Sequence, residues 1–317
     1  MLRAVSFLLS LCLLAAPAWA KPVRIGITQI VEHPALDANR KGMVDRLAEL
    51  GYREGADVVY DVQIAQGNPA TATLIAKKFV GDQVDLIVAI ATPTAVAAAK
   101  ATRTIPIVIS AITDPVGAKL VESLERPGRN VTGTTDLSPV KDQLAMLREI
   151  APGARRVGVI YNAGEPNSVT LVNLARQAGK ELGYEVVEAT VANSAGVMAA
   201  AKSLVGRADA VYVPTDNTVV SALEAVVRVC REAKMPLITG DTDSVARGSI
   251  AAIAIDYYEL GRQTGDMVHR ILQGADPATM PVETLKRFEL HVNRGSAKAM
   301  GVRLPEGFLR RATKIYE

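Results

Sequence analysis

Residues 84–114, VDLIVAIATPTAVAAAKATRTIPIVISAITD, carry the pattern that decides the fold. Val84 to Ile90 is apolar except for Asp85 and rich in β-branched residues, which is typical of a strand buried on both faces of a parallel sheet. Thr92 is expected to cap a helix that Pro93 opens. Ile105 to Ile109 supplies the next strand. Strand, helix and strand in this order predict an α/β fold.

Polar side chains gather where these two strands end. Ligands of open α/β sheets bind outside the carboxyl ends of the strands, beside helix N-termini whose free N–H groups attract negative charge. The first candidates for a binding site are therefore Thr92, Thr94, Ser110 and Thr113. Asp114, at the same end of the sheet, is expected to cap the helix that follows it.

Much of this pattern recurs in the second half of the chain. Residues 84–94 align with residues 208–218, and further matches occur upstream at one constant offset. The chain is therefore predicted to contain two similar βα lobes in series. At the position of Thr92, the second lobe has Asp216, followed by Asn217. We expect the strand-end clusters of the two lobes to face one another across a cleft.

The first twenty residues have the composition of a secretory signal peptide. Arg3 precedes an apolar run, and Ala18-Trp19-Ala20 forms a small-x-small cleavage site. We expect cleavage after Ala20 and release into the periplasm, because the apolar run is too short to serve comfortably as a membrane anchor. About 297 residues then remain, which is enough for two domains.

Charge and cysteine content exclude several classes of function. Loss of Arg3 lowers the net charge from +3 to +2, and no basic run stands out, so nucleic acid is not an expected partner. Only Cys230 remains after cleavage, which excludes an intrachain disulfide, and the apolar pattern around it indicates a buried thiol. The three histidines lack metal-ligand spacing, so we expect no bound metal.

Sequence motifs of catalysis are absent. The chain has no GxxxxGK phosphate loop, no GxGxxG fingerprint after its first strand and no GxSxG nucleophile elbow. We therefore expect neither a cofactor nor enzyme activity.

A series of segments gives the mature chain a family resemblance. They are EHPALDA (32–38), TDPVG (113–117), NVTG (130–133), YN (161–162), PTDN (214–217) and DYYELG (256–261). In these segments the chain resembles the ABC-transporter substrate-binding proteins of the tryptophan/phenylalanine-binding type. The resemblance implies a type I periplasmic-binding-protein fold, in which two Rossmann-like lobes with parallel sheets are joined by three crossovers. It also implies an ABC permease as partner and an aromatic or other apolar amino acid as ligand.

The repeat and the resemblance together set the expected domain boundaries. The signal peptide is residues 1–20, the N-terminal lobe 21–136 plus about 256–278, and the C-terminal lobe 137–255 plus about 279–317. Glu283 to Val292 alternates in hydropathy and predicts one final strand. We expect a monomer whose lobes move about a hinge near residues 136–139 and 256–258.

An amino-acid ligand needs hydroxyls or free N–H groups for its carboxylate and an acid for its ammonium. The four strand-end hydroxyl residues of the first lobe suit the carboxylate. Asp216 is the first candidate for the ammonium, with Glu165 and Asp241 as rivals. Helix capping is the alternative role for both Thr92 and Asp216.

Further candidates lie in loops that face the expected cleft. His33 is expected to bond the ligand or the opposite lobe, or else to belong to a turn fixed by Pro34. Tyr161 and Tyr257 end or follow strands and are candidates for stacking on an aromatic ligand. The remaining candidates, as ligand contacts or turn residues, are Asn162, Asn167, Ser168 and Asn217.

The expected function is capture of a small molecule without chemistry. Ligand that bridges both lobes favours the closed form, which a permease then recognises. The sequence leaves two alternatives open. One is an extracytoplasmic sensor that presents its ligand to a membrane receptor, and the other is a secreted α/β enzyme.

Overall fold

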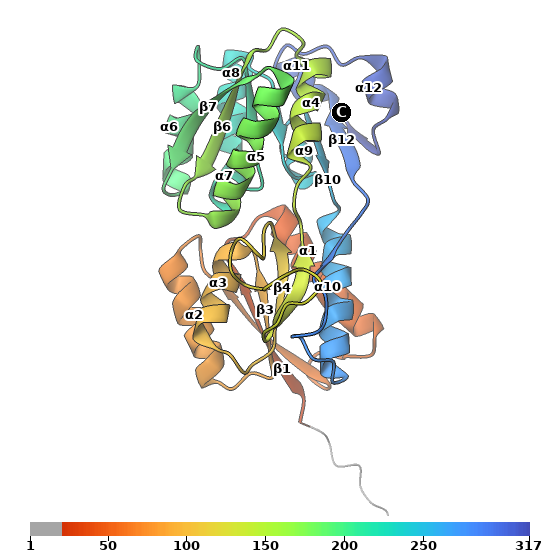
Figure 1. Cartoon of the computed structure of the whole chain (residues 1–317). Helices are drawn as coiled ribbons and strands as arrows, with labels where there is room; N and C mark the ends of the chain where they lie inside the picture. The colour runs from red at the N-terminus through yellow and green to blue at the C-terminus, as the bar shows by residue number, and fades with distance from the viewer. Residues whose placement is uncertain (1–20) are drawn as a thin grey trace, which may run out of the picture.

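The computed structural model describes residues 21–317 and shows two α/β lobes stacked end to end (Figure 1). Each lobe has a mostly parallel sheet with helices packed against it, which confirms the predicted fold class. The predicted signal peptide, residues 1–20, lies outside the described residues. Within residues 21–317, no helix combines the length and the apolar composition that a membrane crossing needs.

The first lobe is built on a six-stranded parallel sheet with the order β11-β5-β4-β3-β1-β2. Its strands are β1 (Val23–Gln29), β2 (Val58–Ile64), β3 (Leu86–Ile90), β4 (Ile107–Ile112), β5 (Val131–Thr135) and β11 (Glu283–Thr284). Its helices are α1 (Pro34–Glu49), α2 (Pro69–Gly81), α3 (Thr92–Ala101) and α10 (Tyr257–Leu272).

The second lobe is built on a seven-stranded sheet with the order β13-β12-β10-β9-β8-β6-β7, in which only the β10–β12 pair is antiparallel. Its strands are β6 (Arg156–Asn162), β7 (Glu185–Val191), β8 (Ala210–Val213), β9 (Leu237–Thr239), β10 (Ala251–Ala254), β12 (Glu289–Asn293) and β13 (Lys314–Tyr316). Its helices are α4 (Val140–Ile150), α5 (Pro166–Leu182), η1 (Ser194–Gly196), α6 (Val197–Ser203), α7 (Asn217–Ser221), α8 (Leu223–Ala233), α9 (Asp243–Ala246), α11 (Arg294–Ala299) and α12 (Glu306–Arg310).

The central strands of the first sheet are buried along their whole length. Every residue of β3, β4 and β5 is buried, as expected for parallel strands with packed layers on both faces. The buried apolar residues form two separate clusters, one in each lobe. Each lobe therefore packs around a core of its own.

The chain passes between the lobes three times. It leaves the first sheet after β5 to form α4, returns after β10 to form α10, and leaves again between β11 and β12. In Figure 1 all three segments cross in the right-hand half of the junction. The three crossovers implied by the family resemblance are present.

One expectation for the last third of the chain was wrong. The alternating stretch from Glu283 to Val292 is not a single strand, because β11 pairs with β5 in the first sheet and β12 pairs with β10 in the second. Glu283 and Thr284, expected in the second lobe, therefore belong to the first sheet. Alternating hydropathy identifies a strand but carries no information on which sheet receives it. The other expected lobe boundaries stay predictions.

Helix α10 returns to the first lobe and packs closely on α1. A Cβ added at Gly261 would lie 1.9 Å from the carbonyl oxygen of Asn39, and one added at Gly42 would lie 2.1 Å from the carbonyl oxygen of Tyr258. Two glycines thus allow the two helix backbones to approach each other directly.

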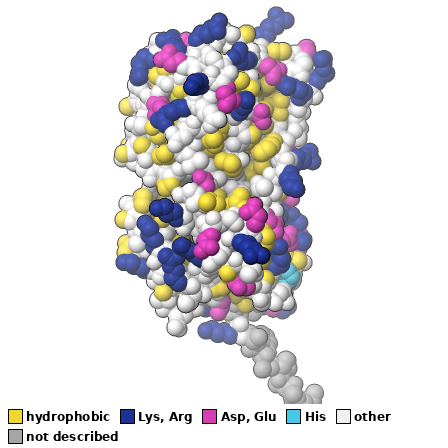
Figure 2. Space-filling model, viewed as in Figure 1, with side chains coloured by type: hydrophobic (Ala, Val, Ile, Leu, Met, Phe, Trp, Pro, Cys, Tyr) yellow, Lys and Arg dark blue, Asp and Glu magenta, His cyan; other side chains and the backbone are white. Residues whose placement is uncertain are grey.

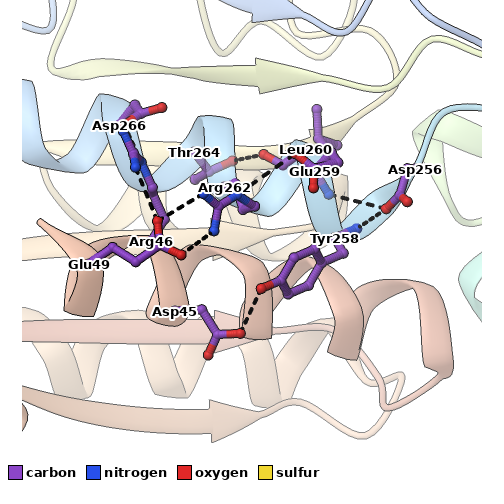
Figure 3. A network of polar contacts seen from close by, with 10 residues as sticks. All are labelled: Asp45, Arg46, Glu49, Asp256, Tyr258, Glu259, Leu260, Arg262, Thr264 and Asp266. Atoms are coloured by element: carbon purple, nitrogen blue, oxygen red, sulfur yellow. Dashed lines mark hydrogen bonds and ion pairs between the residues drawn. The ribbon is translucent and has the colours of Figure 1, made fainter.

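Ion pairs and hydrogen bonds flank this close contact (Figure 3). The Tyr258 hydroxyl donates to Asp45 Oδ2 at 2.8 Å, and the Arg262 guanidinium donates to both Glu49 oxygens at 2.7 and 2.9 Å. The two elements, more than 200 residues apart in sequence, form one face of the first lobe.

Candidate functional site

A cavity lies between the two lobes, and the empty space that it encloses, open solvent included, is about 340 Å³. Its lining residues are His33, Ala35, Leu36, Thr92, Ala111, Thr113, Asp136 and Tyr257 from the first lobe and Asn167, Thr215, Asn217, Val220 and Asp241 from the second. We call it the interlobe cavity. Across the junction α3 contacts α5 and α1 contacts α9, and Figure 2 shows the lobes meeting at a waist. The lobes are therefore closed over the cavity.

Three neighbouring strands supply the first-lobe wall. β3, β4 and β5 are adjacent and parallel, so their carboxyl ends meet at one edge of the sheet. Thr92 follows β3, Thr113 follows β4 and Asp136 follows β5, and all three are buried. The structure thus brings two of the predicted hydroxyl residues, Thr92 and Thr113, to the cavity.

The backbone turns sharply at two alanines beside this wall. Ala91 has φ 75° and Ala111 has φ 56°, both in the left-handed region that favours glycine. Ala111 also lies at a register shift between β4 and β5, which marks a bulge. A left-handed conformation costs a residue with a Cβ about 1 kcal/mol, and strain of this kind concentrates at binding and catalytic sites.

Thr92 does not cap α3, contrary to one of its two predicted roles. The N-cap residue is Ala91, whose side chain cannot accept a hydrogen bond, and Thr92 is the first residue of the helix. Thr92 is 2% exposed, and its buried hydroxyl has no hydrogen-bond partner among the described residues. The cavity is therefore bordered by a helix N-terminus with no side-chain cap and by an unpaired hydroxyl, which together suit an anion.

Asp136 is a buried acid on the same wall. The Tyr257 hydroxyl donates to its Oδ2 at 2.6 Å, and the Thr113 hydroxyl donates to its Oδ1 at 3.3 Å. Burial raises the pKa of Asp136, and these donors oppose the rise. Among residues 21–317, these two hydroxyls are the only side-chain hydrogen-bond donors to Asp136. The carboxylate is suited to pair with a cation that enters the cavity.

The second acid at the cavity, Asp241, belongs to a local structure. Its Oδ1 accepts from the backbone N–H of Ser244 at 2.8 Å and its Oδ2 accepts from the Ser244 hydroxyl at 2.7 Å, which anchors the start of α9. Burial raises the pKa of Asp241, while Ser244 and the charge of Arg247 lower it. Both oxygens of its carboxylate are therefore already engaged within the second lobe.

The second-lobe wall contains amide, hydroxyl and apolar groups. Asn167 donates through Nδ2 to the Thr215 carbonyl oxygen at 3.1 Å. The Oδ1 of Asn167 and the hydroxyl of Thr215 are buried and have no partner within residues 21–317. Val220 adds an apolar surface beside them. Buried polar atoms are usually paired in a protein, so this wall is complementary to a ligand that carries both polar and apolar groups.

His33 fulfils a structural role at the junction of the lobes. It caps α1 by accepting a hydrogen bond at Nδ1 from the backbone N–H of Leu36 at 3.4 Å. The side chain of Asn217 in the opposite lobe lies near the ring and acts to raise the pKa of His33. Burial, reinforced by the charge of Arg247, lowers the pKa of His33 to about 3. The ring is therefore neutral at physiological pH.

This lowered pKa gives a testable pH dependence. A histidine in the unfolded chain has a pKa near 6.5, so its contribution to folding is complete above that pH and is lost as the pH falls toward 3. We expect the wild-type unfolding free energy to fall, relative to that of His33→Gln, by about 1.4 kcal/mol per pH unit below pH ~6.5. Urea denaturation between pH 7.5 and 4.5 measures it. The matched control is His269→Gln on α10, and parallel curves for wild type and His33→Gln would contradict the expectation.

Two predicted hydroxyl residues of the first lobe do not line the cavity. The Thr94 hydroxyl donates to the carbonyl oxygens of Ile90 and Ala91, at 2.6 and 2.9 Å, within its own turn. The Ser110 hydroxyl bonds Asn39 and Thr264 and thereby ties β4 to α1 and α10. Their positions in sequence were correct for the site, but their side chains point away from it.

Tyr161 and Asn162 do not line the cavity either. The Tyr161 hydroxyl donates to Glu188 on β7 at 2.7 Å, so the ring points along the second sheet and cannot stack on a ligand in the cavity. Asn162 donates through its backbone N–H to Asp216 and through Nδ2 to Thr218. It acts as a turn residue, which was the predicted alternative.

The acids predicted to bind an ammonium, Asp216 and Glu165, hold the start of α7. Asp216 is its N-cap and accepts from the backbone N–H groups of Val219 and Asn162 at 2.7 and 2.6 Å. Burial and the charge of Glu165 raise the pKa of Asp216 to about 7, and these two backbone hydrogen bonds and the nearby buried Ser168 oppose the rise. The side chains of Asp216, Glu165 and Ser168 do not line the cavity. Capping, the predicted alternative for Asp216, is its observed role.

Sequence reasoning missed several lining residues. Asp136 was assigned to a hinge, and Leu36, Thr215 and Val220 were not singled out. For Asp136 a signal was available, because it is an acid directly after the buried strand that ends at Thr135. Strand-end acids of a parallel sheet are candidates for ligand contact wherever they occur.

Comparisons with known proteins point to one family. The family model described as "ABC transporter substrate binding protein" matches residues 24–316. A tyrosine-binding protein of Clostridioides difficile is 43% identical over 280 residues, which cover 88% of this chain and 81% of that protein. A Streptococcus protein solved in complex with L-Trp is 34% identical, with a TM-score of 0.90, over 93% of this chain and all of that one.

A second solved structure helps to describe the lobe arrangement. It is a ligand-free, open substrate-binding protein with adhesive properties from Clostridium difficile, 41% identical over 93% of this chain and 99% of its own, with a TM-score of 0.69. Its sequence is closer to this chain than that of the L-Trp complex, yet its structure superposes less well. The two lobes described here therefore have the arrangement of the ligand-bound relative.

Proposed function

Because this chain belongs to the family of ABC transporter substrate-binding proteins, we propose that it captures an aromatic amino acid between its lobes and delivers it to a membrane permease. The family is one of solute-binding proteins rather than enzymes, and we propose that the captured ligand is released unchanged. Members of the family are extracytoplasmic, which agrees with the predicted signal peptide and with our proposal that the mature monomer works in the periplasm.

The observation that carries the ligand class is the chemistry of the interlobe cavity. One wall combines a buried carboxylate, Asp136, with a helix N-terminus that has no side-chain cap. Leu36, Val220 and Tyr257 add apolar surface, and no lysine or arginine is among the described lining residues. An amino acid with an apolar body complements this set, because its ammonium can pair with the acid and its carboxylate can be bound by neutral donors.

The aromatic class is supported by two relatives. One is named for tyrosine, and the other was solved with L-Trp. Both tyrosine and tryptophan carry a large apolar ring with a polar group on it. The second-lobe wall, with Val220 next to unpartnered atoms of Asn167 and Thr215, matches such a side chain in kind.

A ligand screen tests this proposal. The mature chain is refolded to remove carried-over ligand, and its melting temperature is measured with each common amino acid. Ligand at a thousand times its Kd adds about 4 kcal/mol of stability, which corresponds to a rise of roughly 10 °C. We expect a rise with tyrosine, tryptophan or phenylalanine and none with charged amino acids. No rise with any amino acid would overturn the proposal.

The mechanism of capture follows from the two-lobed arrangement. Ligand that contacts both walls binds the closed form better than the open form and shifts the population toward it. The crossovers near residues 136–139 and 256–258 are the proposed hinge. We propose that the permease recognises the closed form, so that only loaded protein is an efficient donor.

A further inference from the structure

Resting on the proposed function, we infer that the first lobe alone holds the backbone end of the amino acid. Asp136 takes the ammonium, and the start of α3 with the Thr92 hydroxyl takes the carboxylate. The second lobe then contacts the side chain through Asn167, Thr215 and Val220. The two lobes have different tasks, because one recognises any α-amino acid and the other selects among them.

Two acids border the cavity, and their surroundings decide which one is free for the ammonium. Asp241 already compensates the N-terminus of α9 through Ser244 and lies within the influence of the Arg247 charge. The side-chain hydrogen bonds that Asp136 accepts come only from two neutral hydroxyls, those of Tyr257 at 2.6 Å and Thr113 at 3.3 Å. A carboxylate offers about four acceptor positions. Asp136 is therefore the buried acid that still lacks a positive partner.

The carboxylate site is defined by two independent features of the first lobe. Helix α3, ten residues long, begins at the cavity, and its N-cap residue Ala91 provides no side-chain cap. The Thr92 hydroxyl is buried, lines the cavity and has no partner within residues 21–317. A carboxylate placed here accepts from the free N–H groups and from this hydroxyl, and it benefits from the helix dipole.

The spacing of these two sites matches an amino-acid backbone. Thr92 follows β3 and Asp136 follows β5, and β4 lies between them in the sheet. Two strand spacings are about 10 Å. The ammonium nitrogen and carboxylate oxygens on one carbon are about 3 Å apart, and a charge-assisted hydrogen bond at each end adds about 2.8 Å. The head group therefore bridges the ends of three neighbouring strands.

The second lobe has a different set of groups for the remainder of the ligand. Asn167 Oδ1 and the Thr215 hydroxyl are unpartnered, and neither carries a charge. Val220 is buried beside them. Neutral polar and apolar groups in this combination suit a side chain, whereas they would leave an ammonium and a carboxylate without counter-charges.

Binding by isothermal titration calorimetry to three related ligands tests the division of tasks. L-Tyrosine has both charged groups, 3-(4-hydroxyphenyl)propionate lacks the ammonium, and tyramine lacks the carboxylate. We expect Asp136→Asn to weaken tyrosine binding about 100-fold and to change the affinity for the propionate by less than about threefold. Asp241→Asn, the matched control at the second acid, should change both affinities by the same factor.

Two further variants keep the test decisive if Asp136→Asn does not fold. Thr92→Val should weaken tyrosine and propionate binding about tenfold while leaving the affinity for tyramine unchanged. Tyr257→Phe removes the donor that orients Asp136, so it should weaken tyrosine binding several-fold more than propionate binding. Tyrosine binding that survives Asp136→Asn but is lost selectively in Asp241→Asn would overturn the assignment. A wild-type chain that binds no amino acid would instead refute the proposed function itself.

Discussion

Replacing Glu165 with alanine is expected to lower the free energy of unfolding by about 4 kcal/mol. This carboxylate is 6% exposed and accepts from the backbone N–H groups of Asn217 and Thr218 at 3.2 and 3.0 Å. It also accepts from their side chains, at 2.5 Å from Asn217 Nδ2 and 2.7 Å from the Thr218 hydroxyl. The variant leaves these buried donors without an acceptor, and each such donor costs about 1 to 3 kcal/mol.

Urea denaturation at pH 7.5 measures the effect. Glu181→Ala is the matched control, because Glu181 lies at the other end of α5, is solvent-exposed and pairs only with exposed groups such as Lys141. We expect a change of less than about 0.5 kcal/mol there. Since Asn217 lines the interlobe cavity, Glu165→Ala should also reduce ligand affinity. If Glu165→Ala and Glu181→Ala unfolded at the same urea concentration, α7 would not depend on the Glu165 carboxylate.

Replacing Gly261 with alanine is expected to cost about 3 kcal/mol or more of folding stability. The added Cβ would lie 1.9 Å from the carbonyl oxygen and 2.8 Å from the carbonyl carbon of Asn39, both in the backbone of α1. A flexible side chain could turn aside, but a helix backbone cannot. The two helices would have to separate, which would disturb the hydrogen bond from Asn39 Nδ2 to the Tyr257 carbonyl oxygen at the cavity.

Gly81→Ala provides the control for this second prediction. Gly81 is the last residue of α2, and a Cβ there meets no atom within 4 Å. Alanine in a helix is favoured over glycine by about 0.5 to 1 kcal/mol, so this variant should be as stable as wild type or slightly more stable. Equal unfolding curves for Gly261→Ala and Gly81→Ala would disprove the close helix contact.

The sequence was sufficient for the architecture because the strands of a parallel sheet are recognisable locally. Residues 86–90 and 107–109 are continuous apolar runs, and the recurrence of the pattern at residue 208 predicts the second lobe. The division of 283–292 between β11 and β12 was not predictable in this way. Which sheet a short strand joins depends on partners more than 100 residues distant, such as β5.

The sequence was enough to locate the candidate site but not to assign a role to each of its residues. Thr92 and Thr94 lie in the same first turn of α3, yet only Thr92 faces the cavity, since the Thr94 hydroxyl bonds the preceding carbonyls. The direction in which each side chain of the first turn points depends on the backbone turn at Ala91. Its left-handed φ is not predictable for an alanine from sequence. Capping was predicted for Thr92, but neither threonine caps α3, because Ala91 is its N-cap residue.

The acids show the same limit. Asp216 and Asp136 both follow buried strands, and the sequence favoured Asp216 because of its place in the repeat. In the structure Asp216 caps α7. Asp136 instead accepts a hydrogen bond from the hydroxyl of Tyr257, which lies 121 residues away in the chain. Only three-dimensional contacts distinguish an acid that caps a helix from one that is free to bind a ligand.

The late return of the chain to the first lobe constrains the order in which the protein can fold during synthesis. The first sheet begins with β1 at residue 23, but its helix α10 ends at residue 272 and its edge strand β11 at residue 284. The face of α1 that receives α10 therefore stays uncovered until nearly nine-tenths of the polypeptide has been made. The first lobe therefore cannot complete its sheet and its helix layer until almost the whole chain is available.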